Sequence, residues 1–135
     1  MLNNGEKKIA HSFDKSFYCQ IQYNKPSKYK EIEKFTSQAS NIITCGSNYS
    51  YSPIFLSKTS HVLDLRNFNR ILGFSREKKE ITVESGLKIS ELLNFFLPHK
   101  LWIPQIPGYP FITVGGIVAS NAHGKSCGIH GTIRK

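Results

Sequence analysis

A run of small side chains between residues 107 and 125 constrains this chain more than any other feature of its sequence. Small side chains let another stretch of backbone, or a large flat ligand, approach the main chain closely. If Gly115 and Gly116 open a short helix, its free N–H groups and positive dipole end favour an anion. Tight packing of that helix against a strand is the alternative, and the run by itself leaves both open. The small residues are Gly115, Gly116, Ala119, Ser120, Ala122 and Gly124.

A second glycine-bearing segment directly follows a short β-branched stretch at residues 42–45. A loop after a strand can turn several backbone N–H groups toward one point and bind phosphate oxygens. Gly46 and Asn48 permit the left-handed backbone that such a turn needs, and Ser47 offers a hydroxyl donor. Taken alone, the segment favours an ordinary surface loop, because one glycine loop is weak evidence for a site. Cys45 is expected to be a small buried residue at the strand end and not a nucleophile.

Apolar spacing along the rest of the chain predicts short strands and two amphipathic helices. Their order indicates an α+β or α/β lobe, and we expect the α+β fold class. Residues 1–16 are polar and without period, so we expect a flexible leader there. We expect Trp102 to fill the core, His61 to lie at the surface and residues 104–135 to be mostly loop. The expected strands are residues 17–23, 42–45, 61–65, 71–74 and 81–84. The first expected helix is residues 28–39, with Ser27 as its N-cap. The second contains Ile89, Leu92, Leu93 and Phe96 and ends at Pro98.

Composition narrows the classes of function. The 135 residues provide room for one domain or two small lobes. Eighteen Lys and Arg against nine Asp and Glu give a net charge of +9, which favours anionic partners, but no basic stripe with interleaved aromatics predicts nucleic-acid binding. No apolar run approaches the roughly 18 residues of a membrane helix, and the start lacks a signal peptide.

The three cysteines, Cys19, Cys45 and Cys127, are an odd set without a C-x-x-C pair. They favour a reduced compartment, and with the charge and hydropathy pattern they predict a cytoplasmic protein. His123, Cys127 and His130 have spacing like part of a zinc motif, but a fourth ligand is missing, so no metal site is expected.

The motifs of residues 101–125 resemble a known family. The run Leu101-Trp102-Ile103-Pro104, then Pro107-Gly108, then Thr113-Val114-Gly115-Gly116, then His123-Gly124-Lys125 resembles, without a gap, the flavin-binding core of the vanillyl-alcohol oxidase superfamily, or PCMH-type FAD-binding domain. Within it, the chain is most similar to decaprenylphosphoryl-ribose 2-oxidase-like and aldonolactone-oxidase-like enzymes. Residues 46–51 fall where these enzymes have their pyrophosphate loop, G-x-G-x-S-Y, and Gly46, Ser50 and Tyr51 match it. The resemblance spans about residues 18–133.

The resemblance implies a two-lobed domain with FAD between the lobes, in which residues 17–103 form the first lobe and residues 104–135 begin an incomplete, truncated second one. It implies that Lys125 lies near the substrate as a catalytic residue, where a cation favours an anionic substrate or the negative charge of reduced flavin. The implied cofactor contacts are Thr44, Cys45, Gly46, Ser47, Asn48, Tyr49, Ser50, Tyr51, Ser52 and Pro53 in the first segment, and Gly108, Thr113, Val114, Gly115, Gly116, Ser120, Asn121, Ala122 and His123 in the second.

Three departures from the family pattern affect the first segment. Asn48 stands in place of the second loop glycine, and Ser52-Pro53 in place of a Gly-Asp pair. Tyr49 occupies the position where many members carry a histidine bonded covalently to the flavin. A tyrosine cannot form that histidyl link, so the expected FAD is non-covalent.

The function implied is that of the N-terminal part of an FAD-dependent oxidoreductase. The whole enzyme would take a hydride from a CH–OH group of a sugar, polyol or lactone-like substrate onto the flavin. Expected partners are FAD, that substrate and a second chain that supplies the missing lobes. The alternative is a non-catalytic or degenerate flavin- or nucleotide-binding module, which predicts FAD binding without turnover.

Overall fold

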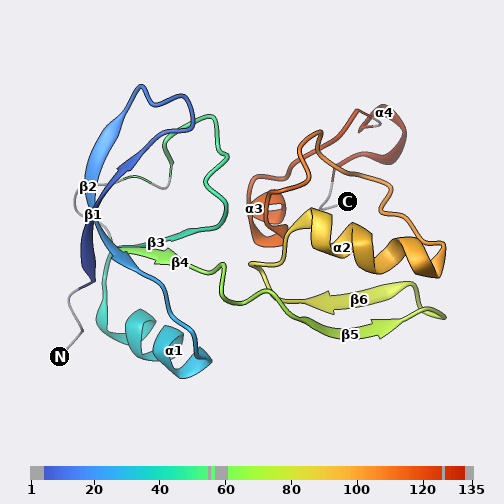
Figure 1. Cartoon of the computed structure of the whole chain (residues 1–135), viewed down its shortest axis with the longest axis horizontal. Helices are drawn as coiled ribbons and strands as arrows, with labels where there is room; N and C mark the ends of the chain where they lie inside the picture. Colours follow the sequence, from blue (N-terminus) through green and yellow to red (C-terminus); the bar gives the residue numbers. More distant parts are fainter. Residues whose placement is uncertain (1–4, 55, 57–60, 126, 133–135) are drawn as a thin grey trace. The chain divides into compact units, whose positions relative to one another are not determined.

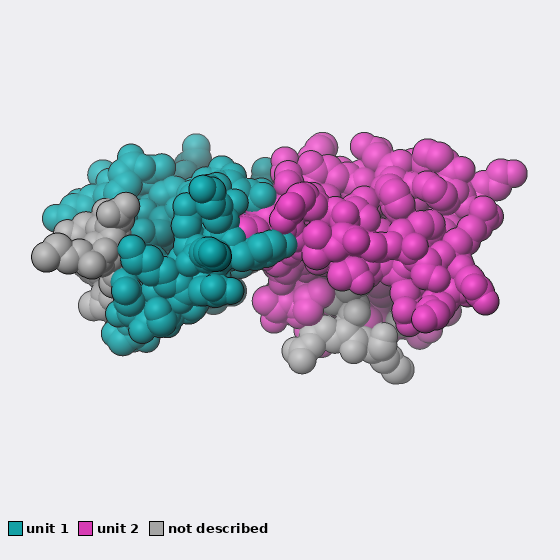
Figure 2. Space-filling model, turned by 90° about the horizontal axis from the view of Figure 1, so that it is seen from below, with its two compact units in different colours: residues 1–67 teal, residues 68–135 magenta. Residues whose placement is uncertain are grey.

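A computed structural model describes residues 5–54, 56, 61–125 and 127–132 (Figure 1). The chain divides into two compact units, Met1–Asn67 and Phe68–Lys135 (Figure 2). This division falls earlier than the expected boundary between residues 103 and 104. Strands and helices occur in both units, and the fold class is α+β, as predicted.

Unit 1, residues 1–67, is built on a four-stranded sheet in the order β1-β2-β4-β3. Strand β2 (Tyr18–Asn24) pairs antiparallel with β1 (Glu6–His11) and parallel with β4 (His61–Asp64), which pairs parallel with β3 (Ile42–Cys45). The inward-facing residues of these strands form one buried cluster, as the alternating pattern predicts for a half-buried sheet. This cluster contains Cys19, Ile21, Cys45 and Val62.

Strand β1 lies inside the segment expected to be a flexible leader. It pairs residue by residue with β2, from Glu6 opposite Tyr23 to His11 opposite Tyr18. Its large apolar residue, Ile9, is 77% exposed, and its half-buried residues are Lys8 and Ala10, of which Ala10 packs against the core. A search for apolar spacing therefore misses this strand, although its main chain pairs fully with β2.

Helix α1 (Tyr29–Gln38) confirms the predicted helix. Its N-cap residue is Lys28, one residue after the expected cap, Ser27. The Glu31 carboxylate accepts the Ser27 N–H at 2.7 Å and the Lys28 N–H at 3.2 Å, so an acidic side chain within the first turn satisfies these donors. The helix buries Phe35, whose ring lies edge-on to the His61 ring at 5.5 Å. His61 is therefore half-buried, and its expected surface position is wrong.

Unit 2, residues 68–135, begins with the predicted hairpin, β5 (Ile71–Ser75) and β6 (Glu80–Val83). Helix α2 (Ile89–Phe96) follows and continues into a single 3₁₀ turn, η1 (Leu97–His99), which contains Pro98. The apolar face of α2 packs with the hairpin and with residues 101–114. The buried residues of this core are Leu87, Leu92 and Phe96, and Ile71, Phe74, Ile81, Val83, Phe95, Leu101, Ile103 and Val114 pack against them.

The last part of the chain holds more regular structure than its glycine content suggests. Helices α3 (Val114–Ala119) and α4 (Cys127–His130) lie in the stretch expected to be mostly loop. Trp102 is 63% exposed, so its expected place in the core is wrong, although its two neighbours do pack there. No helix in the described ranges is long and apolar enough to cross a membrane.

Candidate functional site

The segment after β3 turns sharply in the way the sequence predicts. Cys45 ends the strand, and its carbonyl accepts the Leu65 N–H at 3.1 Å. Three residues later Asn48 has φ 60°, the left-handed conformation that a glycine adopts most easily and asparagine tolerates. Asn48 thus supplies the turn for which the family uses a glycine.

This turn carries polar groups without protein partners. The Ser47 hydroxyl oxygen is buried and has no hydrogen-bond partner among the described residues. The main-chain hydrogen bonds of the described part of the chain use none of the N–H groups of residues 46–48. Buried polar groups are normally satisfied, so a cluster of donors beside a strand end fits an anionic ligand such as a diphosphate.

Aromatic rings flank the same segment. Tyr51 is 87% exposed and Tyr49 is 39% exposed. Both rings contact Phe13 from the β1–β2 loop, with centroids 5.7 Å apart for Tyr49 and 5.8 Å for Tyr51. The remaining predicted residues of the segment are Thr44, Ser52 and Pro53, which are exposed, and Gly46 and Ser50, which are half-buried.

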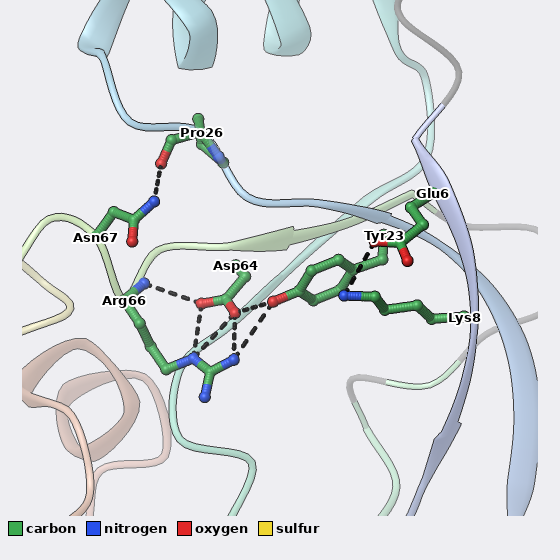
Figure 3. Close-up of polar contacts among 7 residues, drawn as sticks. All are labelled: Glu6, Lys8, Tyr23, Pro26, Asp64, Arg66 and Asn67. Carbon is green, nitrogen blue, oxygen red and sulfur yellow. Dashed lines mark hydrogen bonds and ion pairs between the residues drawn. The ribbon is translucent and has the colours of Figure 1, made fainter.

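A buried carboxylate lies at the end of β4, next to β3 in the sheet (Figure 3). Asp64 is fully buried, and its carboxylate accepts the Arg66 Nε–H at 2.9 Å and the Tyr23 hydroxyl. Burial raises the pKa of Asp64, but the hydrogen bonds from Arg66 and Tyr23 outweigh it, so the pKa lies below its ordinary value. Burial, with the Asp64 contact next, raises the pKa of Tyr23 to about 12. Asp64 is therefore a charged anchor that ties β2 to β4.

Cys45 shares this environment. Burial, and then the negative charge of Asp64, raise the pKa of its thiol to about 12. The thiol is therefore neutral near pH 7 and a poor nucleophile. This agrees with the expectation that Cys45 is a buried strand-end residue.

In unit 2, Gly115 and Gly116 of the small-residue run lie in the first turn of α3. Thr113 is 3% exposed and caps the helix, its Oγ1 accepting the Gly116 N–H at 3.3 Å. The Val114 N–H donates to the Leu87 carbonyl and the Gly115 N–H to the Ser85 carbonyl, both at 2.8 Å. These amides are satisfied inside the chain, so the opening turn of α3 does not supply the free N–H groups that its glycines suggest.

Two glycines in this run are required by close packing. A Cβ at Gly115 would lie 2.8 Å from the Ser85 Cβ, and one at Gly124 would lie 2.2 Å from the Ile106 carbonyl oxygen. Gly108, in contrast, has nothing within 4 Å of the position of a Cβ. Gly115 therefore packs the helix against the turn at Ser85, between β6 and α2, while Gly108 leaves open space beside the main chain.

Gln105 holds the His-Gly-Lys motif to the rest of unit 2. Its side chain is buried, at 4% exposure. Its Oε1 accepts the Gly124 N–H at 2.7 Å, and its Nε2 donates to the Gly131 carbonyl at 2.6 Å. One amide thereby pins two segments that otherwise lack regular structure.

The other residues of unit 2 that were predicted as site residues are exposed, except the half-buried Ala122. Asn121 has φ 47° and, like His123, is exposed. Ser120 donates from its hydroxyl to the Gly116 carbonyl at 2.7 Å, and Ala122 is half-buried. Lys125 is exposed and forms no ion pair with another described residue. The side chains of Cys127 and His130 lie outside the described part of the chain.

Sequence reasoning missed Phe13 and Gln105. Phe13 lies in the segment expected to be a flexible leader, although its turn-forming neighbours Asp14, Lys15 and Ser16 are a signal for a tight loop. Gln105 is one polar residue among apolar ones, and nothing in the sequence distinguishes it from a surface residue.

Comparison with known proteins identifies the family of the chain. The family model described as "FAD binding domain" matches residues 24–135. Decaprenylphosphoryl-beta-D-ribose oxidase from Mycolicibacterium smegmatis is 32% identical over 85 residues, covering 63% of this chain and 18% of that protein. L-gulonolactone oxidase from Mus musculus is 25% identical over 114 residues, covering 81% of this chain and 26% of that protein. The chain thus spans about a quarter or less of the length of these two relatives.

Solved structures show the same fold. A cholesterol oxidase from Brevibacterium sterolicum matches with a TM-score of 0.77 at 16% identity, covering 88% of this chain and 24% of that one. An alkyldihydroxyacetonephosphate synthase matches with a TM-score of 0.71 at 18% identity, covering 85% of this chain and 25% of that one. Because the family model covers most of the sequence, this chain belongs to the family of FAD binding domains, of the PCMH type predicted from its motifs.

Proposed function

We propose that this chain binds FAD non-covalently and is the cofactor-binding part of an oxidoreductase acting on a CH–OH group of a sugar, polyol or lactone-like substrate. The observation that carries the proposal is the buried Ser47 hydroxyl, which has no hydrogen-bond partner among the described residues and lies in a turn that directly follows a strand. The motif resemblance assigns this turn to the pyrophosphate. The printed names of the relatives, a ribose oxidase and a gulonolactone oxidase, support the substrate class.

In unit 1, the N–H groups of residues 46–51 and the Ser47 hydroxyl are the groups that would hold the diphosphate of FAD. Asn48 has the left-handed conformation with which a loop can turn successive amides toward one ligand. Tyr49 carries no imidazole, which supports non-covalent attachment. Thr44, Ser52 and Pro53 flank the turn.

In unit 2, Gly108 would allow close approach of the ring system, since it has open space at its Cβ position. Residues 113–116, the opening turn of α3, are the other proposed contact. Their contribution is shape, because the first amides of α3 are already used within the chain. The exposed Ser120, Asn121 and His123 would supply polar contacts. When bound, FAD accepts the hydride. The Lys125 ammonium would favour an anionic substrate or negative charge developing beside it.

A binding titration tests the proposal. The purified chain should quench flavin emission on titration with FAD, and Ser47→Ala should weaken that binding, because it removes a buried hydroxyl from the proposed diphosphate site. Ser37→Ala is the matched control, since its hydroxyl donates only to the Lys34 carbonyl on α1. Absence of saturable FAD binding by the wild-type chain would overturn the proposal.

Turnover distinguishes the alternative, a non-catalytic or degenerate flavin-binding module. Bleaching of bound flavin under anaerobic conditions by aldonolactones or sugars supports an oxidoreductase, while binding without bleaching supports the alternative. A second polypeptide supplying further lobes is a proposed partner, and its addition should then be required for bleaching. Placement in the cytoplasm is likewise a proposal, supported by the free thiols of Cys19 and Cys45.

A further inference from the structure

The loop between β1 and β2 is a tightly bonded turn. Ser12 is 1% exposed; its hydroxyl donates to Asp14 Oδ1 at 2.6 Å and accepts the Phe17 N–H at 3.0 Å. Asp14 also accepts the N–H and the hydroxyl of Ser16, at 3.1 and 2.8 Å. These hydrogen bonds, those from the Ser12 and Ser16 side chains first, lower the pKa of Asp14 to about 2, so the carboxylate is charged at neutral pH. Lys15 completes the turn with φ 59°.

This turn presents Phe13 to the candidate diphosphate loop. The Phe13 ring meets the Tyr49 ring at 57° and the Tyr51 ring nearly edge-on, at 83° (Figure 1 shows the β1–β2 loop beside the segment after β3). Tilted and edge-on arrangements at 5.7 and 5.8 Å are favourable for aromatic pairs. Phe13 therefore contacts two of the six residues in the loop from a separate, well-ordered part of the chain.

The contact with Phe13 adds order to the loop of residues 46–51. The loop holds Asn48 in a left-handed conformation, and the Ser47 hydroxyl and the N–H groups of residues 46–48 have no hydrogen-bond partner among the described residues, so hydrogen bonds of these groups do little to order the turn. A loop that must be ordered when a ligand arrives binds more weakly than one already held in the bound conformation. A fixed ring packed on Tyr49 and Tyr51 provides that order in advance.

We propose that Phe13 is a positioning residue of the cofactor site: it holds residues 46–51 in the conformation that receives the diphosphate of FAD. The inference rests on the proposed function. Phe13 also lies outside residues 24–135, the range that the family model matches. The N-terminal hairpin of this chain is thereby part of its cofactor site.

The variant Phe13→Ala tests this inference. Its dissociation constant for FAD should rise about three- to tenfold, the range expected for loss of favourable aromatic pairs. Without FAD, the amides of residues 46–51 should exchange hydrogen faster than in the wild-type chain, a change that cofactor chemistry does not influence. Phe13→Trp keeps an aromatic ring and should restore both properties.

Phe17→Ala is the matched control. Phe17 lies at the other end of the same turn with similar exposure, 42% against 46%, and its side chain has no ring contact with Tyr49 or Tyr51. Its main-chain hydrogen bonds to Ser12 remain in the variant. FAD affinity and exchange in residues 46–51 should therefore match the wild-type chain.

The outcomes separate the two proposals. If the wild-type chain does not bind FAD, the proposed function fails, and exchange in the cofactor-free chain still decides whether Phe13 orders the loop. If the wild-type chain binds FAD but Phe13→Ala changes neither affinity nor exchange, the positioning role is overturned and the proposed function stands. Equal losses in Phe13→Ala and Phe17→Ala would also overturn it, because they would show general loosening of the hairpin.

Discussion

Asp64 shows how one residue links the core of unit 1 to its candidate diphosphate loop. Its carboxylate is fully buried and paired with Arg66, and it lies opposite Cys45, the last residue before the turn. Removing one member of a buried charge pair leaves the other without its partner. The side chain of Arg66 is 40% exposed, so solvent reduces part of that cost.

We therefore expect Asp64→Asn to lower the free energy of unfolding by about 2 kcal/mol, since hydrogen bonds to a charged group are lost. The loss should be largest at neutral pH. The folded-state pKa of Asp64 lies below its unfolded value, so its stabilisation is present above the unfolded pKa and disappears as pH falls through the lowered one. Urea unfolding followed by circular dichroism at neutral and acidic pH measures both effects.

Glu6→Gln is the control for that experiment. Glu6 pairs with Lys8 at 3.1 Å on the surface of the same sheet, where its side chain is 69% exposed. Exposed pairs contribute little, so this variant should unfold like the wild-type chain. An Asp64→Asn variant as stable as Glu6→Gln would show that the buried carboxylate is not an anchor.

Cys45 gives a second prediction for a single residue. Its pKa of about 12 leaves only a very small thiolate fraction even at about pH 9, so alkylation of Cys45 in the folded chain should stay slow at about pH 7 and at about pH 9. In urea the same thiol should react as an ordinary cysteine, and faster at the higher pH. Peptide mass spectrometry after timed iodoacetamide treatment compares the two states, and rapid alkylation of native Cys45 would contradict the assignment.

Among the elements, α3 and the segments after it depend on two kinds of main-chain contact. One is the close approach at Gly115 and Gly124, and the other is the pair of hydrogen bonds from Gln105. Both lie within unit 2. Neither contact is made by apolar side chains, so both act in addition to the burial of Ile117 and the packing of Val114, and neither leaves an apolar period in the sequence.

Gly124→Ala should strongly destabilise unit 2, because the added methyl group would lie 2.2 Å from the Ile106 carbonyl oxygen and the backbone must shift. Gly128→Ala is the matched control, since nothing lies within 4 Å of its Cβ position. Thermal unfolding of the two variants compares them. Equal melting temperatures would show that the backbone does not approach this closely.

Gln105→Ala should lower the free energy of unfolding by about 1–3 kcal/mol, the cost of leaving a buried donor and acceptor unpaired. It removes the partners of the Gly124 N–H and the Gly131 carbonyl. Faster hydrogen exchange at Gly124 should accompany the loss. Unchanged exchange there would mean that Gln105 does not hold the His-Gly-Lys motif.

The difference between apolar side-chain patterns and main-chain contacts explains which elements the sequence could predict and which it could not. Strand β2 and helices α1 and α2 were predictable because their apolar residues follow the period of the element. Strand β1 was not, because its Ile9 faces solvent and its half-buried residues are Lys8 and Ala10, which give no apolar alternation. The prediction for Trp102 was wrong because apolar neighbours in the sequence indicate burial. Leu101 and Ile103 do pack against the core, but the indole of Trp102 between them is exposed.

For the candidate site, glycines located both segments but did not reveal how each glycine acts. Asn48 turns the backbone as expected, yet Gly115 serves packing and its N–H is already bonded. Contacts between distant residues, such as Phe13 with Tyr51, require the folded chain. The sequence of one chain contains no signal for such contacts.

At the scale of the whole molecule, ligand binding should stabilise the folded chain. A ligand that binds only the folded state adds about 2.7 kcal/mol at a hundredfold excess over its dissociation constant. FAD should therefore raise the melting temperature of the wild-type chain, and raise it less at the same concentration for Ser47→Ala. Identical shifts in both proteins would place the cofactor away from the turn after β3.

The exposed position of Trp102 has a practical consequence. It is the single tryptophan of the chain, and it belongs to unit 2. Indole emission therefore reads that half of the protein alone, whereas the tyrosines are divided, with Tyr109 in unit 2 and the other five in unit 1. The chain carries its own optical probe for the loss of unit 2, which can be timed without a dye or a label.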